Sequence, residues 1–133
     1  MSVLSIDGWD IQIADIDFLL QKEIDGTPSM LIHLRSGETN CCEFAGVVER
    51  EKAWETIRKT FMKDDFYECP QIFFRREAVV AASIGENKED GPYIQMGFRG
   101  GMLLRRPFAD KKTRDEDFAM LNQLLLNHPH QLH

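Results

Sequence analysis

Apolar and polar residues alternate along much of this chain, with the period of β-strands that bury one face. Met30, Ile32 and Leu34 give the clearest case, because polar or charged residues follow on the other side of the strand at His33 and Arg35. Turn-forming glycine and proline residues separate the alternating stretches. In the first half we expect strands at about residues 9–13, 16–20, 30–35 and 39–44.

The second half shows the same kinds of pattern. Strands are expected at residues 72–74, 79–84 and 94–99, with a further strand ending at Pro107-Phe108. Residues 89–92 and the glycine pair 100–101 supply the turns between them.

Two stretches have the period of an amphipathic helix instead. In residues 49–62, Trp54, Ile57 and Phe61 fall on one face. A second helix is expected to begin at a capping box formed by residues 113–116 and to end near residue 127, with its own apolar face. That face carries Phe118, Leu121 and Leu125.

These patterns recur at a constant spacing, which indicates an internal duplication. Residues 28–61 align with residues 92–125 without a gap, at an offset of 64, with six identities in 34 positions. Pro28 falls on Pro92, and Arg35 falls on Arg99. We predict a β-β-β-β-α unit present twice, with repeat 1 at about residues 3–62, repeat 2 at about residues 71–126, a connector at 62–70 and a tail at 127–133.

The predicted fold class is α+β, with two helices packed on antiparallel sheet. Short glycine-containing turns join neighbouring strands in the antiparallel sense. A unit of about 64 residues buries little apolar surface alone, so the two copies are expected to share one core in a single compact domain, residues 1–133.

Composition narrows the protein class. Of the 133 residues, 43% are hydrophobic, which is ordinary for a globular protein, and the longest apolar stretches are far shorter than a membrane span. The first residues lack the pattern of a secretion signal, and the three cysteines include an adjacent pair, Cys41 and Cys42, that cannot readily bond to each other. We expect a cytoplasmic protein with reduced thiols and no membrane association.

Charge is distributed unevenly. Residues 1–66 carry 13 acidic and 7 basic side chains and hold the whole net charge of -6, whereas residues 67–133 carry 9 of each kind. An acidic segment at residues 7–25 and a basic segment at residues 99–114 therefore predict surfaces of opposite charge.

Motifs for chemistry are absent from the sequence. It has no phosphate-binding loop, dinucleotide fingerprint, nucleophile elbow or Cys-x-x-Cys pair. His33 is expected on the strand face opposite the core, without an identifiable orienting partner. We predict no catalytic residue, no metal site and no cofactor.

The preferred function is a small non-catalytic protein-binding module, such as a regulator, adaptor, chaperone or inhibitor, acting through a sheet face and charged surfaces. The same surfaces would also suit self-association into a homodimer or larger homo-oligomer. The candidate partner-binding residues are Asp15, Asp17, Arg35, Arg99, Arg105 and Arg106.

Two alternatives stay open. The arginine-rich second repeat, with aromatic residues among its arginines, could bind nucleic acid or another anion. Neighbouring residues on a strand point to opposite faces, however, so Arg105 and Arg106 cannot both line one surface. The third reading, a small enzyme, would require a pocket that gathers His33 or a thiol with a carboxylate.

Overall fold

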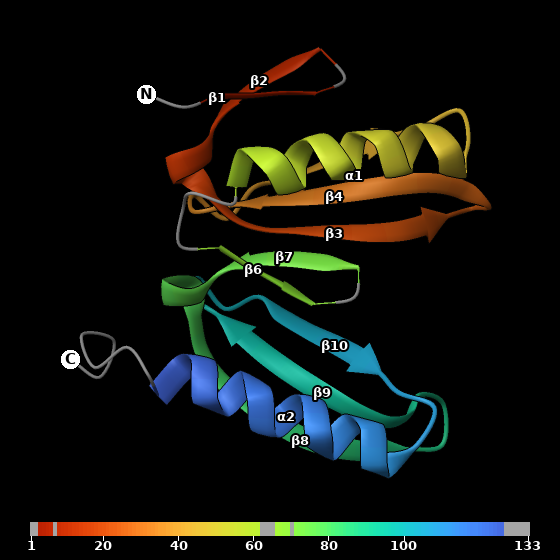
Figure 1. Ribbon diagram of the computed structural model, residues 1–133, viewed down its shortest axis with the longest axis vertical. Coiled ribbons are helices and arrows are strands. Elements are labelled where there is room, and N and C mark those ends of the chain that lie inside the picture. Colours follow the sequence, from red (N-terminus) through yellow and green to blue (C-terminus); the bar gives the residue numbers. More distant parts are fainter. Residues whose placement is uncertain (1–2, 7, 62–65, 70, 127–133) are drawn as a thin grey trace. The chain divides into compact units, whose positions relative to one another are not determined.

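The computed structural model describes residues 3–6, 8–61, 66–69 and 71–126 (Figure 1). Within these residues the chain forms two helices and ten strands in antiparallel sheets, which confirms the predicted α+β class. Backbone contacts divide the chain into two compact units, residues 1–75 and residues 76–133.

The first unit contains seven strands and one helix. They are β1 (Val3–Ile6), β2 (Trp9–Gln12), β3 (Ile16–Ile24), β4 (Thr27–Leu34), β5 (Thr39–Glu43), α1 (Val47–Phe61), β6 (Phe66–Cys69) and β7 (Ile72–Arg75). A short 3-10 turn, η1 (Ile13–Asp15), links β2 to β3.

Five of these strands form one antiparallel sheet in the order β5-β4-β3-β7-β6. The β3–β4 connection is a two-residue turn in which Asp25 and Gly26 both have positive φ, 52° and 79°, as a tight Asp-Gly hairpin turn requires. β1 and β2 pair with each other as a separate two-stranded sheet. β3 is therefore an inner strand, hydrogen-bonded to β4 on one edge and to β7 on the other.

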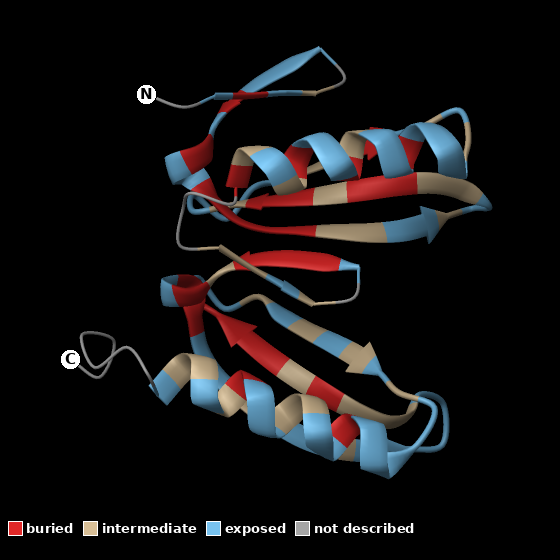
Figure 2. Ribbon diagram, in the orientation of Figure 1, coloured by how far each residue is buried: buried red, intermediate tan, exposed pale blue. Residues whose placement is uncertain are grey.

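The core of this unit lies between α1 and the sheet. Trp54, Ile57 and Phe61, the predicted helix face, are buried in one apolar cluster with residues of β3, β4 and β7 (Figure 2). Leu4 and Ile11 bring the β1–β2 hairpin into the same cluster. Burial of these side chains is the main source of stability for the helix and the sheet.

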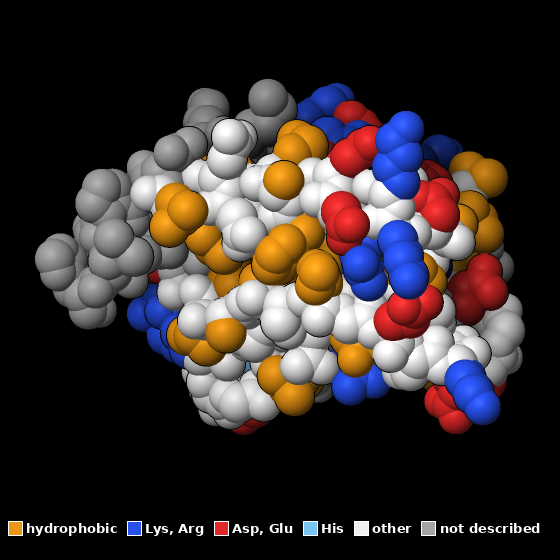
Figure 3. Space-filling model, turned by 90° about the horizontal axis from the view of Figure 1, so that it is seen from below, with side chains coloured by type: hydrophobic (Ala, Val, Ile, Leu, Met, Phe, Trp, Pro, Cys, Tyr) orange, Lys and Arg blue, Asp and Glu red, His pale blue; other side chains and the backbone are white. Residues whose placement is uncertain are grey.

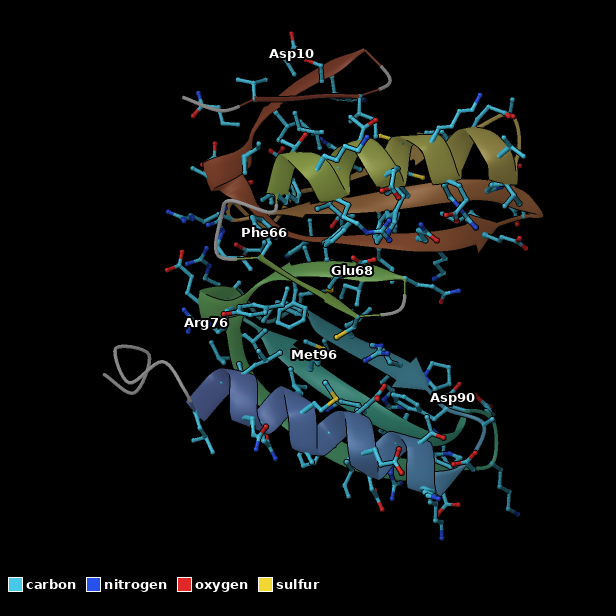
Figure 4. The ribbon with its side chains drawn as sticks, viewed as in Figure 1. Asp10, Phe66, Glu68, Arg76, Asp90 and Met96 are labelled. Carbon is cyan, nitrogen blue, oxygen red and sulfur yellow. The ribbon has the colours of Figure 1, made fainter. Side chains whose placement is uncertain are left out.

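The β6–β7 hairpin is held to α1 by both apolar and charged contacts. Phe73 of β7 stacks on Trp54, with ring centroids 4.6 Å apart, and Phe66 of β6 stacks on Phe61 at 4.4 Å. Glu68 of β6 accepts hydrogen bonds from Arg58 Nε at 2.8 Å and from Arg58 Nη2 at 2.6 Å. Phe66 and Glu68 are marked in Figure 4.

The second unit is a smaller helix-and-sheet structure. It contains a 3-10 turn, η2 (Arg76–Ala78), followed by β8 (Val79–Asn87), β9 (Gly91–Phe98), β10 (Leu103–Pro107) and α2 (Lys111–Leu126). Its three strands are antiparallel in the order β10-β9-β8. Ile94, Met96 and Phe98 of β9 are buried, as is Leu121 of α2.

The order of elements from β1 to α1 recurs from β6 to α2, including the 3-10 turn. Backbone hydrogen bonds recur with it: Phe44 N–H donates to Pro28 O, and Phe108 N–H donates to Pro92 O. Arg50 Nη1 donates to Lys22 O at 3.2 Å, as Arg114 Nη1 donates to Gly85 O at 2.9 Å. These correspondences support the duplication, which itself stays a prediction.

The sequence prediction is wrong about the number of strands and about the start of the last helix. Each recurring segment has five strands rather than four, because β1 was not expected and β6 lies in the predicted connector. The last helix begins at Lys111 rather than at a box starting with Thr113. Asp110 accepts a hydrogen bond from Thr113 N–H at 2.7 Å, so Asp110 satisfies an amide that the helix leaves open, and this bond lowers the pKa of its carboxyl.

The contact between Phe73 and Trp54 generates the first prediction. Phe73→Ala should lower the free energy of unfolding by about 3–5 kcal/mol, because it removes a buried ring and leaves a cavity beside α1. Chemical denaturation monitored by circular dichroism measures this loss. Phe108→Ala, which changes a half-buried ring outside this contact, is the control. A loss at Phe73 no greater than that of the control would contradict the described packing.

Candidate protein-interaction edge

One strand edge distinguishes the second unit from the first. Within the described residues β8 is hydrogen-bonded to β9 alone, whereas β3, its counterpart in the order of elements, pairs on both edges. The register of the two hairpins agrees: Gln21 lies opposite Met30, and Ile84 lies opposite Ile94. Among the described residues no strand pairs with the edge of β8 that corresponds to the β7-bonded edge of β3, and its backbone groups are open to pairing there.

The side chains of β8 are suited to pairing. Residues 79–85 contain no charged side chain and no proline, two of the usual means of protecting an exposed edge, although a register shift interrupts the ladder between Val79 and Ala81. Val80 is 67% exposed and Ile84 is 45% exposed. A long apolar edge of this kind is a typical site for addition of another strand.

The exposed Ile84 lies on the side of the sheet that α2 covers. Glu86 forms an ion pair with Lys111 of α2 at 3.2 Å, and alternate residues of a strand share a face. Ile84 also lies opposite the buried Ile94. An added strand at this edge would therefore extend beneath α2.

α2 itself presents incompletely buried apolar residues. Phe118 and Leu125 are half-buried, although their counterparts in α1, Trp54 and Phe61, are buried against the β6–β7 hairpin. Met120 is 66% exposed on the same helix. Figure 3, which views the molecule from the α2 side of Figure 1, shows hydrophobic side chains gathered near the centre of this face. We call β8 with the half-buried residues of α2 the β8 edge.

Two of the six residues predicted from charge lie together in the first unit. Arg35 N–H donates to Asp15 O at 2.8 Å, and both residues help to line an open hollow of about 290 Å³ with Leu34 and Ser36. Asp17, by contrast, is fully buried. An interaction surface cannot use that carboxylate without rearrangement of the strand.

The predicted arginines of the second unit engage local partners. Arg105 donates from Nε to Gln95 Oε1 at 2.9 Å and lies over the Tyr93 ring at 4.6 Å. Arg106 points instead toward α2, where Nη2 lies 3.8 Å from Asp117 Oδ2. The two side chains thus diverge, as strand alternation requires.

The backbone of Arg99 is held within the same unit. Its N–H donates to Ala78 O at 2.8 Å, at the place in the second unit that Arg35 and Asp15 occupy in the first. Because Asp17 is buried and Arg105 and Arg106 diverge, the six charged residues do not form one surface.

His33 is buried rather than exposed on the open face. Its ring stacks on Phe18 with centroids 4.9 Å apart, and Nδ1 lies 2.9 Å from Thr39 Oγ1. Burial lowers the pKa of His33, an effect that the nearby Asp17 carboxylate partly opposes. These contacts give the imidazole a packing role.

The described residues contain no group of three or more His, Cys, Asp or Glu side chains placed to hold a metal ion. Neither described helix is long and apolar enough to span a membrane. Comparisons with models of protein families, with curated proteins and with solved structures find no match to the chain.

Sequence reasoning located β8 but missed that it forms an edge. The signal available was a strand with little charge: residues 79–85 read Val-Val-Ala-Ala-Ser-Ile-Gly. Such a run is equally typical of a strand buried inside a sheet. Strand pairing distinguishes the two cases, and pairing depends on contacts distant in sequence.

The burial of His33 generates a prediction about pH. In the unfolded chain His33 binds a proton near its usual pKa of 6.5, whereas the folded protein resists protonation, so the free energy of unfolding should fall as pH drops below about 6.5. His33→Asn removes the titrating ring and should reduce this loss between about pH 7 and pH 5.5. Urea denaturation at several pH values measures it, and an equal loss in both proteins would contradict the assignment.

Proposed function

We propose that this chain is a small, non-catalytic, cytoplasmic protein-binding module whose binding surface is the β8 edge. The observation that carries the proposal is the difference between two counterpart strands. β3 is completed by an antiparallel strand, β7, whereas β8 has no such neighbour among the described residues. A partner that adds an antiparallel strand would satisfy the backbone groups of β8 and cover its apolar side chains.

The energetics favour binding at this place. Covering Val80 and Ile84 removes apolar surface from water, and each Å² that is covered contributes about 25 cal/mol of favourable free energy. Main-chain hydrogen bonds supply alignment, and the side chains that alternate along the added strand supply selectivity. The alternative of an anion-binding second repeat has less support, because Arg105 and Arg106 already engage local partners on different faces.

A matched pair of variants tests the proposed surface. Ile84→Lys places a charge on the β8 edge, whereas Leu103→Lys places one on β10, at the opposite edge of the same sheet, where Leu103 is 62% exposed. Tagged full-length chains are used to capture binding proteins from an extract of the source cells, with quantification by mass spectrometry. We expect a stoichiometric partner, which can include a second copy of the chain, to be retained by wild type and Leu103→Lys and lost from Ile84→Lys.

Circular dichroism establishes that each variant is folded before capture. A set of captured proteins that is the same for all three chains would overturn the proposal. Loss of a partner from Leu103→Lys alone would also overturn it, because binding would then depend on the β10 edge.

A further inference from the structure

The partner chemistry that the β8 edge accepts can be derived from the strand that completes β3. β7 pairs with β3 through Leu19 opposite Phe73, and Gln21 N–H donates to Gln71 O at 2.9 Å. Phe73 points toward α1, where it stacks on Trp54. A strand added to β8 in the same geometry would place one side chain opposite Ala82 and beneath α2, so this position calls for a large apolar residue.

The β1–β2 hairpin of another copy does not meet this requirement, although it is the counterpart of the β6–β7 hairpin. Its residue in the place of Phe73 is Asp10, and its residue in the place of Glu68 is Ser5, by the matching cross-strand pairs Ser5–Asp10 and Glu68–Phe73. Asp10 would bring a carboxylate beneath Phe118. Desolvation of that charge disfavours the hairpin as the occupant.

We infer that the occupant is the β8 strand of a second copy of this chain, paired antiparallel about a twofold axis. This inference rests on the proposed function of the β8 edge and names its partner. With Ser83 opposite Ser83 of the second copy, Ile84 of each chain lies opposite Ala82 of the other. Ile84 then occupies the place that Phe73 has in the first unit.

The side chains near the axis are compatible with this pairing. Residues 81–85 are uncharged, so the central pairs of the ladder bring no like charges together. The outward N–H and C=O groups of Ala82 pair with those of Ile84 of the other chain, and the groups of Ile84 pair with those of the other Ala82. The two sheets join into one six-stranded sheet with both copies of α2 on the same face.

The helices have room for this arrangement. Neighbouring strands are about 4.8 Å apart, so two helices that each lie over β8 and β9 would be separated by about 10 Å, close to the usual packing distance of helices. Phe118 and Leu125 of each copy, half-buried in one chain, would face the partner helix and the added strand. The dimer thus covers the apolar residues of α2 that are only half-buried in one chain, whereas their counterparts in α1 are already buried.

A disulfide cross-link tests the register. Ser83 is a non-hydrogen-bonded position in this pairing, with Cα atoms about 4.5 Å apart across the axis, within reach of a disulfide. Full-length Ser83→Cys should form a covalent dimer on mild oxidation. Wild type, with its three native cysteines, and Leu103→Cys, on the opposite edge, are the controls. Cross-linking no greater than in these controls would overturn the register.

Sedimentation of the purified full-length protein tests the dimer itself. We expect a concentration-dependent dimer whose dissociation constant rises roughly tenfold or more in Ile84→Lys, because the lysine loses apolar contact and lies diagonally across the axis from a like charge. Leu103→Lys should leave the constant unchanged. A wild-type monomer at every concentration, or equal dimerisation of all three chains, would overturn the inference.

The two proposals fail separately. If purified wild type is a monomer but a different captured protein is lost from Ile84→Lys, the β8 edge is a binding surface and the second copy is not its occupant. If neither association depends on Ile84, both proposals are wrong.

Discussion

The packing of the β6–β7 hairpin beside β3 and against α1 determines how the first unit is completed. Phe73 and Phe66 stack on aromatic residues of α1, and Glu68 joins the hairpin to Arg58 of the same helix. The hairpin thereby converts β3 from an edge strand into an inner strand and buries the apolar face of α1. The hairpin starts the second recurring segment along the chain, but it completes the sheet of the first unit. The second unit therefore contains the counterpart strands and helix, β8, β9, β10 and α2, without a hairpin beside β8 among the described residues.

The functional proposal follows from that difference. A sheet edge with apolar side chains and unpaired backbone groups is normally protected by charge, by proline or by another strand. β8 has neither charge nor proline over residues 79–85, and its helix has Phe118 and Leu125 only half-buried. Addition of a strand from another chain satisfies all of these features together. The charged residues that looked suitable in the sequence instead form local contacts or, as with Asp17, are buried.

Local sequence pattern predicted much of the fold, because alternation and helical period depend on burial of one face. The helix face formed by Trp54, Ile57 and Phe61 is buried as expected. β6 was missed because its four residues are too few for a clear period. The burial of His33 was missed because alternation assigns side chains to the two faces of a strand but does not show whether both faces are covered. The candidate site depends on which strands pair, a property of distant contacts.

The central claim is that a strand from another copy completes β8, and amide hydrogen exchange at Ile84 tests it most directly. Ile84 N–H corresponds to Gln21 N–H, which donates to Gln71 O on the completed edge of β3. At a protein concentration that favours association, nuclear magnetic resonance should show that the Ile84 N–H is protected from exchange. The protection should be lost on dilution, and the backbone amide at position 84 should be unprotected in Ile84→Lys. An Ile84 amide that exchanges as fast as an exposed, unbonded amide at every concentration would contradict the account.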